Sequence, residues 1–185
     1  MVKRTAERKI GSEAGRFDAF RLAARGEALR GEIDVAGRER IADRLAATGG
    51  PVRVAWKIEG GRDALERPVL RVRLQGSVPL VCQRCLQPIE VALDQRSELL
   101  LAREETELAR LDADEREVVL AAAPLDAKTL VEDELLLSLP FAPMHPEMQC
   151  PWGAGSVGAR DVQSETSPFA RLAAIKKGRG ETHEE

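Results

Sequence analysis

The sequence predicts an α+β fold in which an antiparallel β-sheet packs against helices, with flexible segments at both ends. Apolar and polar residues alternate over residues 52–58, 70–80 and 89–93. Such alternation is typical of strands in an antiparallel sheet with one buried face and one face in water. A single strong helical pattern follows at residues 125–138. Long strands followed by a helix in one short chain favour an α+β arrangement.

The N-terminal part of the chain gives weaker signals. Residues 1–16 are charged and contain two glycines, so we expect a flexible leader. The apolar alternation at residues 20–22 is too short to assign. Residues 29–35 alternate over a longer stretch and predict a strand, and residues 37–47 predict a helix that ends at the Gly-Gly-Pro run of residues 49–51.

The central strands predict where two glycines and one cysteine lie. Gly60 and Gly61 come between two alternating segments and indicate a turn. Cys82 has the same parity as Leu80 and Val78, so its sulfur is expected on the buried face of the sheet unless a turn rotates it.

The helix at residues 125–138 has recognisable signals at both ends. Asp126 is a suitable N-cap residue, and Leu125 and Leu130 can form a hydrophobic staple. Pro140 terminates the helix. A broad apolar face predicts packing against the sheet.

Three consecutive acidic residues interrupt this helix, namely Glu132, Asp133 and Glu134. They span too wide an arc for all of them to face water. Glu134 lies at the edge of the apolar face, where a carboxylate needs a partner. Arg84 is the expected partner, and a surface rotamer of Glu134 is the alternative.

Length and composition indicate one domain with tails. A chain of 185 residues with 43% hydrophobic residues has room for one core, and we expect it at residues 17–153. Residues 154–185 are expected to form a linker and a short basic amphipathic helix, with Ser167 as its cap and Pro168 in its first turn. A helix this short is marginal in water, so it forms on a partner or folds back onto the domain.

The charge distribution argues against a protein-wide RNA-binding surface. The formal net charge is −3, and only 3% of residues are aromatic, without a tyrosine. Base-stacking RNA-binding folds need exposed rings. Basic clusters lie near both ends, and an acidic stretch at residues 104–117 is expected to form a loop that can receive a basic protein, although solvated surface also explains it.

Compartment follows from the cysteines and from the hydropathy. The chain carries three cysteines, an odd number, and neither a secretory signal nor an apolar run of membrane-spanning length is evident. These features predict a cytoplasmic protein without a membrane partner.

Three cysteines and one histidine form the most informative motif. Cys82 and Cys85 are a Cys-x2-Cys pair, and His145 and Cys150 follow about sixty residues later. Three thiolates and one imidazole suit a closed tetrahedral zinc site. Inert reduced thiols are the alternative. Redox chemistry is disfavoured because Pro88 blocks the helix that usually activates such a pair.

Three segments of the chain resemble the YceD family of bacterial large ribosomal RNA subunit accumulation proteins. They are the Val-Cys-Gln-Arg-Cys run at residues 81–85, the stretch from Val131 through Pro140 to His145 and Cys150, and the Ser-Pro-Phe-Ala-Arg-Leu run at residues 167–172. The resemblance implies a presumed metal-binding factor for production, processing or stability of large-subunit ribosomal RNA, with no catalytic residues to carry over.

We therefore expect a non-enzymatic assembly factor whose partner is a ribosomal large-subunit precursor, through its RNA or its proteins, and which takes no small-molecule substrate. A thiol- or metal-dependent enzyme acting on RNA is the alternative, and direct RNA binding through the basic tail is a third possibility. The oligomeric state is open. The residues expected to contact the partner are Arg84, Glu132, Glu134, Phe169, Arg171, Lys176 and Lys177.

Overall fold

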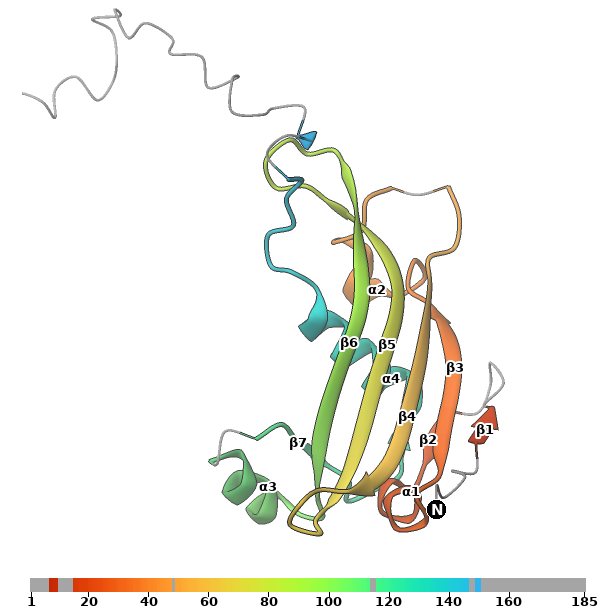
Figure 1. The fold of residues 1–185 in the computed structure, drawn as a ribbon, viewed down its shortest axis with the longest axis vertical. Coiled ribbons are helices and arrows are strands. Elements are labelled where there is room, and N and C mark those ends of the chain that lie inside the picture. Colours follow the sequence, from red (N-terminus) through yellow and green to blue (C-terminus); the bar gives the residue numbers. More distant parts are fainter. Residues whose placement is uncertain (1–6, 10–14, 48, 114–115, 147–148, 151–185) are drawn as a thin grey trace, which may run out of the picture.

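A computed structural model describes residues 7–9, 15–47, 49–113, 116–146 and 149–150. The strands are β1 (Glu7–Lys9), β2 (Arg16–Phe17), β3 (Ala28–Asp34), β4 (Arg53–Arg62), β5 (Pro68–Val81), β6 (Pro88–Ala102), β7 (Val118–Leu120) and β8 (Leu125–Asp126). The helices are α1 (Ala19–Arg25), α2 (Glu39–Ala42), α3 (Glu105–Asp112) and α4 (Ala127–Ser138). Figure 1 shows their arrangement.

The main sheet has six strands in the order β1-β3-β4-β5-β6-β7. Its four central strands, β3 to β6, pair antiparallel and follow one another in the chain. Short strands at the two edges, β1 and β7, pair parallel with β3 and β6. A second sheet contains β2 and β8. The predicted α+β fold with a largely antiparallel sheet is confirmed.

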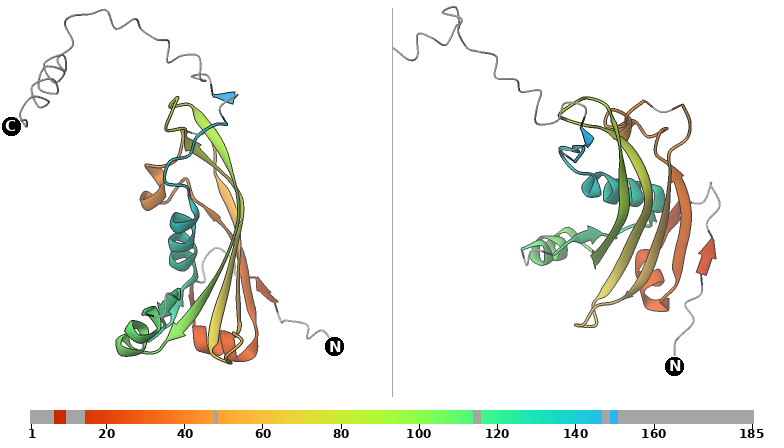
Figure 2. Two further views of the ribbon diagram at one scale, coloured as in Figure 1. Left: turned by 60° about the vertical axis from the view of Figure 1, so that its left-hand side comes forward. Right: turned by 45° about the horizontal axis from the view of Figure 1, so that its top comes forward.

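One face of the sheet carries the main core. The alternation predicted for β4 is observed, since Val54, Trp56 and Ile58 are buried. Helix α4 lies across this face, as Figure 2 shows, and Val131 and Leu135 are fully buried there. A smaller cluster lies beneath α3 and includes Val69, Leu100, Ala102 and Leu111.

The segment that was too short to assign forms helix α1. Asp18 caps its first turn by accepting the backbone N–H of Arg21 at 2.9 Å. Gly26 ends the helix with φ of 61°, in the left-handed region that glycine adopts without strain. Both signals are local, but a helix this short acquires its stability from packing against β4.

The predicted turn at Gly60 and Gly61 is wrong, because both glycines lie within β4. The chain turns at residues 63–66, where the Asp63 carboxylate accepts the backbone N–H groups of Leu65 and Arg67. Gly60 is needed for a different reason. A Cβ at this position would collide with the backbone of α1 at Leu22.

Two further expectations about local structure are corrected. The helix predicted over residues 37–47 is only the short α2, because Leu45 forms a β-bridge with Leu80 and Ala46 donates its N–H to the carbonyl of Pro79 at 2.9 Å. The acidic stretch at residues 104–117, expected as a loop, contains α3. Leu111 is buried on that helix and anchors it.

The predicted termini lie largely outside the described residues. Within the expected leader, Glu7–Lys9 form β1 beside β3. The expected linker and tail helix at residues 154–185 fall entirely outside. The division into leader, domain and tail stays a prediction. In the described part of the chain, no helix is long and apolar enough to cross a membrane.

We expect Gly60→Ala to destabilise the protein by about 1–3 kcal/mol, because the added methyl group would push α1 away from β4. Urea-induced unfolding measures this change. Gly37→Ala is the matched control, since a Cβ there meets nothing within 4 Å. Equal stability of the two variants would show that α1 does not pack closely on Gly60.

Candidate metal centre

The turn between β5 and β6 positions the first two cysteines. Cys82 directly follows β5 and Pro88 begins β6. The N–H of Cys82 donates to the carbonyl of Gln87 at 2.9 Å, and the N–H of Leu86 donates back to the carbonyl of Cys82 at 2.9 Å. Leu86 has φ of 59°, an uncommon conformation for leucine that lets the chain reverse tightly. Cys82 and Cys85 are both buried in this turn.

The segment after α4 brings the second pair to the same place. Pro140 lies just beyond the end of α4, and the chain then runs towards the tip of the β5–β6 hairpin (Figure 1). The N–H of Gln83 donates to the carbonyl of Pro143 at 2.9 Å. The N–H of His145 lies 3.4 Å from the sulfur of Cys82, which accepts it. These two bonds join the segment to the hairpin tip.

The four side chains form a compact donor cluster. The sulfur atoms of Cys82, Cys85 and Cys150 and a ring nitrogen of His145 all lie within 4.8 Å of one another. In a tetrahedral zinc site, bond lengths of about 2.3 Å to sulfur and 2.0 Å to nitrogen place the ligand atoms roughly 3.5–3.8 Å apart. The observed distance from Cys85 Sγ to His145 Nδ1 is 3.4 Å. The residues therefore fit a tetrahedral metal ion.

One contact fixes which nitrogen of His145 faces the cluster. Its Nε2 lies 3.1 Å from the carbonyl oxygen of Pro88. A carbonyl can only accept, so Nε2 carries the hydrogen and Nδ1 offers its lone pair towards Cys85. A backbone carbonyl that holds the second nitrogen is the usual outer partner of a metal-binding histidine.

The two cysteines of the turn differ in their electrostatics. Burial acts to raise the pKa of Cys82, but hydrogen bonds from the backbone N–H groups of Cys85, His145 and Arg84 outweigh it and lower this pKa to about 5. Burial raises the pKa of Cys85, and the neighbouring sulfur atoms of Cys82 and Cys150 raise it further. Deprotonation of all three thiols would bring like charges close together in this buried cluster, and a bound metal ion would offset that cost.

This arrangement suits a structural metal. Four protein donors occupy every position of a tetrahedral ion and leave none for water or substrate. Cys82 is fully buried, as its parity in β5 predicts. The sequence spacing identified the four residues that the fold assembles, and the structure shows that the three thiols lie together with the imidazole instead of apart.

The expected ion pair between Arg84 and Glu134 is wrong. Arg84 lies at the hairpin tip, where its guanidinium approaches the sulfur of Met144 at 3.9 Å. The Glu134 carboxylate accepts a hydrogen bond from the hydroxyl of Ser97 on β6. Glu134 is buried, and the hairpin tip is out of its reach along the length of β6. No local pattern signals this pairing, because Ser97 and Glu134 lie 37 positions apart in the chain.

Three arginines that the sequence analysis did not assign to the site contact α4 or the segment that follows it, and two of them pair with its acidic residues. Arg38 and Arg40 approach the buried Glu132 carboxylate at 3.8 and 4.0 Å, and Arg40 pairs with Asp133 at 2.6 Å. Arg44 donates to the carbonyl of Pro140 at 2.9 Å. The repeated arginines around α2 were the only feature of the sequence that could have indicated these contacts.

These contacts leave the expected roles in partner binding as predictions. Glu132 and Glu134 are engaged within the chain, and Arg84 is exposed. The other expected contact residues, Phe169, Arg171, Lys176 and Lys177, lie outside the described residues.

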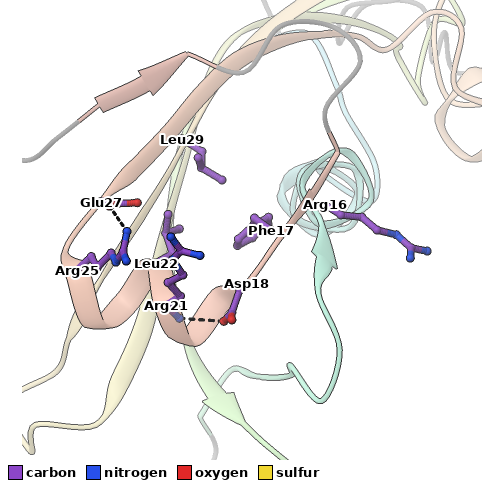
Figure 3. A pocket seen from close by; sticks show the side chains of 8 residues that line it. All are labelled: Arg16, Phe17, Asp18, Arg21, Leu22, Arg25, Glu27 and Leu29. Carbon is purple, nitrogen blue, oxygen red and sulfur yellow. Dashed lines mark hydrogen bonds and ion pairs between the residues drawn. The ribbon is translucent and has the colours of Figure 1, made fainter.

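A hollow beside α1 is separate from the metal cluster. It has a volume of about 180 Å³ and lies between β2, α1 and β3 (Figure 3). Its charged groups do not converge on one point. Arg16 points away from the others, Arg25 pairs with Glu27 at 3.5 Å, and Asp18 serves as the cap of α1. The hollow therefore has no arrangement of groups that indicates a ligand.

We expect Glu134→Gln to stabilise the protein at about pH 8 and to lose this advantage towards about pH 4. Burial is the main cause of the raised pKa of Glu134, and the nearby Glu117 and Asp133 carboxylates add to it. A raised pKa in the folded state means that ionisation destabilises the fold, and this cost disappears as the pH falls through that pKa. Urea unfolding at both pH values measures the difference from the unmodified protein. Glu98→Gln, which removes an exposed carboxylate, is the control, and the same trend in both variants would contradict the prediction.

Comparison with known proteins identifies the family. The family model described as "Large ribosomal RNA subunit accumulation protein YceD" matches residues 70–176, more than half of the chain, including most of β5, all of β6 and α4, and all four donor residues. No curated protein and no solved structure shows significant similarity to the chain. The extent of the family match shows that this chain belongs to the YceD family.

Proposed function

We propose that this protein is a non-enzymatic factor that supports the synthesis, processing or stability of large-subunit ribosomal RNA during ribosome assembly, and that a structural zinc ion holds its donor cluster together. The family description supports a role in large-subunit RNA accumulation. The single observation that carries the mechanistic part is the convergence of Cys82, Cys85, His145 and Cys150.

The chemistry of the donors favours zinc over other common ions. Thiolate and imidazole ligands are too soft for magnesium or calcium, which prefer oxygen. Three cysteines and one histidine form a well-known ligand set for tetrahedral zinc. When bound, zinc would supply a fixed positive charge that neutralises the thiolates and cross-links the two segments. The proposed compartment is the cytoplasm, because thiolate ligands must stay reduced.

The cross-link would join segments that are far apart in the chain. The two cysteines of the hairpin tip lie about sixty residues before His145, and α4 lies between the two pairs. Joining both ends of this long stretch restricts the unfolded chain much as a disulfide does. The cluster would therefore hold the segment after α4 against the sheet and keep the surface of the family-matched region in one shape for a ribosomal precursor.

The described residues support a non-enzymatic role. A closed four-donor site offers no open coordination position. The carboxylates of α4, the other candidates for metal-assisted RNA cleavage, are held by arginines and by Ser97. Consecutive residues on a helix also diverge, so Glu132 and Asp133 are poorly placed to hold one ion together.

Purified protein should contain about one zinc ion per chain, and Cys85→Ser and Cys150→Ser should each lose it. At free zinc about a thousandfold above the dissociation constant, loss of binding should reduce the free energy of unfolding by about 4 kcal/mol. Elemental analysis and thermal unfolding measure these effects on untagged protein. Gln87→Ser is the matched control, because the Gln87 side chain is exposed and is not one of the four proposed metal ligands. Full stability in the cysteine variants would reject a structural metal.

In cells that lack the protein, the unmodified chain should restore the ratio of large-subunit to small-subunit ribosomal RNA, and Cys85→Ser should restore it poorly. The alternative, an RNA-cleaving enzyme, predicts a different pattern. Cleavage of precursor RNA by purified protein that survives Cys85→Ser but is lost in Glu132→Gln would overturn the non-enzymatic proposal. An unchanged RNA ratio in cells without the protein would contradict the proposed role itself.

A further inference from the structure

The upper part of β6 is an open edge of the main sheet. β5 pairs with β6 along one side from Pro88 to Leu100. On the other side, β7 pairs only with Leu100–Ala102. Among the described residues, no strand flanks residues 89–99 on this side, and Figure 1 shows β6 as the outer strand above β7. An open edge of this length is a template for pairing with another strand.

The hydrogen bonds at both ends of the edge show which residues face outward. The Cys82–Gln87 bond continues the antiparallel ladder, in which the odd-numbered residues of β6 direct their backbone N–H and C=O groups towards β5. The backbone N–H and C=O groups of the even-numbered residues point away from β5. The carbonyl of Pro88 accepts from His145, and the N–H of Leu100 donates to Glu117. The backbone groups of Ala92, Asp94, Arg96 and Glu98 therefore face the open edge.

A row of like charges ends at this edge. On the face of the sheet opposite the core, Arg30, Lys57, Arg73 and Arg96 stand directly opposite one another across the four strands from β3 to β6. Directly opposed like charges destabilise a sheet. Within the row, Lys57 pairs with Glu59 at 2.8 Å and Arg73 pairs with Asp94 at 3.1 Å. Among the described residues, Arg96 has no hydrogen bond or ion pair.

We propose that two copies of this chain pair through their β6 strands, antiparallel and related by a two-fold axis at Gln95. In this register, Asp94 of each copy stands opposite Arg96 of the other copy. The pairing places an acidic residue at the end of each row of cations and joins outward-facing backbone groups. The inference concerns a surface outside the metal centre and does not depend on the proposed function.

Charge excludes the neighbouring registers. A shift of two residues in one direction places Asp94 opposite itself, and a shift in the other direction places Arg96 opposite itself, so each juxtaposes like charges. A larger shift that pairs Arg96 with Glu90 brings Pro88 into the pairing, and Pro88 has no N–H to donate and has its carbonyl engaged by His145.

The available length also fits the Gln95 axis. β7 occupies the edge from Leu100 onward, and His145 occupies the carbonyl of Pro88 at the other end. Pairing over residues 91–99 uses the stretch between these limits, about 30 Å of strand. Val91, which is half-buried at the edge of the core, would gain cover from Leu99 of the second copy.

Sedimentation equilibrium of the full chain under reducing conditions tests this dimer. We expect a concentration-dependent dimer, at least tenfold weaker dimerisation for Arg96→Asp, and recovery in the double variant Asp94→Arg/Arg96→Asp, which exchanges the charges. Arg53→Asp changes an exposed cation away from the edge and should leave dimerisation unchanged. A protein that stays monomeric, or a dimer that Arg96→Asp does not weaken, would overturn the proposal.

A cross-link locates the axis without relying on the charge variants. Gln95 faces Gln95 of the second copy at a position without mutual hydrogen bonds, where Cα atoms lie about 4.5 Å apart, within range for a disulfide. Gln95→Cys should form a disulfide dimer on mild oxidation. Arg53→Cys, an exposed position on β4 that β5 separates from this edge, should not. Equal cross-linking of both variants, or none in Gln95→Cys, would refute this register.

Discussion

The antiparallel pairing of β5 with β6 is the constraint on which the rest of the structure depends. Its register runs from Val69 opposite Leu100 to Val81 opposite Pro88. Because side chains alternate between faces, a slip of one residue would move every core side chain of one strand into water. The same register fixes the cysteine pair at the hairpin tip, places Ser97 beside α4 and directs alternate backbone groups of β6 towards the open edge.

Helix α4 connects this hairpin to the remainder of the chain. Its apolar face, including Val131 and Leu135, is buried on the sheet. Its acidic residues have different kinds of partner. Glu132 and Asp133 are held by arginines near α2, whereas Glu134 has only the hydroxyl of Ser97 as a hydrogen-bond partner among the described residues. A buried carboxylate with one neutral partner is costly when ionised, so this position responds to pH.

The end of α4 also leads into the metal cluster. Pro140 prevents the helix from continuing, and the chain then crosses to the hairpin tip. Two hydrogen bonds hold it there, from the N–H of Gln83 to the carbonyl of Pro143 and from the N–H of His145 to the sulfur of Cys82. Within the family-matched part of the chain, α4 thus packs on the sheet, and the segment after α4 returns to the tip of the β5–β6 hairpin in the same sheet. The arginines around α2 join the N-terminal part of the chain to α4. Arg40 forms an ion pair with Asp133, and Arg44 donates a hydrogen bond to the carbonyl of Pro140.

The sequence by itself determined the features that depend on neighbouring residues. The alternation of β4 and β5, the Asp126 cap of α4 and the spacing of the four donor residues were all readable, because each follows from a local period or a local hydrogen bond. The C-terminal boundary of β6 could not be predicted as easily. Residues 99–102 are all buried because the strand packs on both faces there, so the alternation of apolar and polar residues is lost.

Tertiary structure decided the features that depend on distant neighbours. Gly60 looked like a turn residue, but it is a strand residue that must lack a side chain because α1 lies against it. The partner of Glu134 is Ser97 and not Arg84, because the register of β6 against α4 sets the distance. The meeting of Cys85 with His145 could be proposed from their chemistry, but only the fold brings their donor atoms to 3.4 Å, since no local period relates residues sixty positions apart.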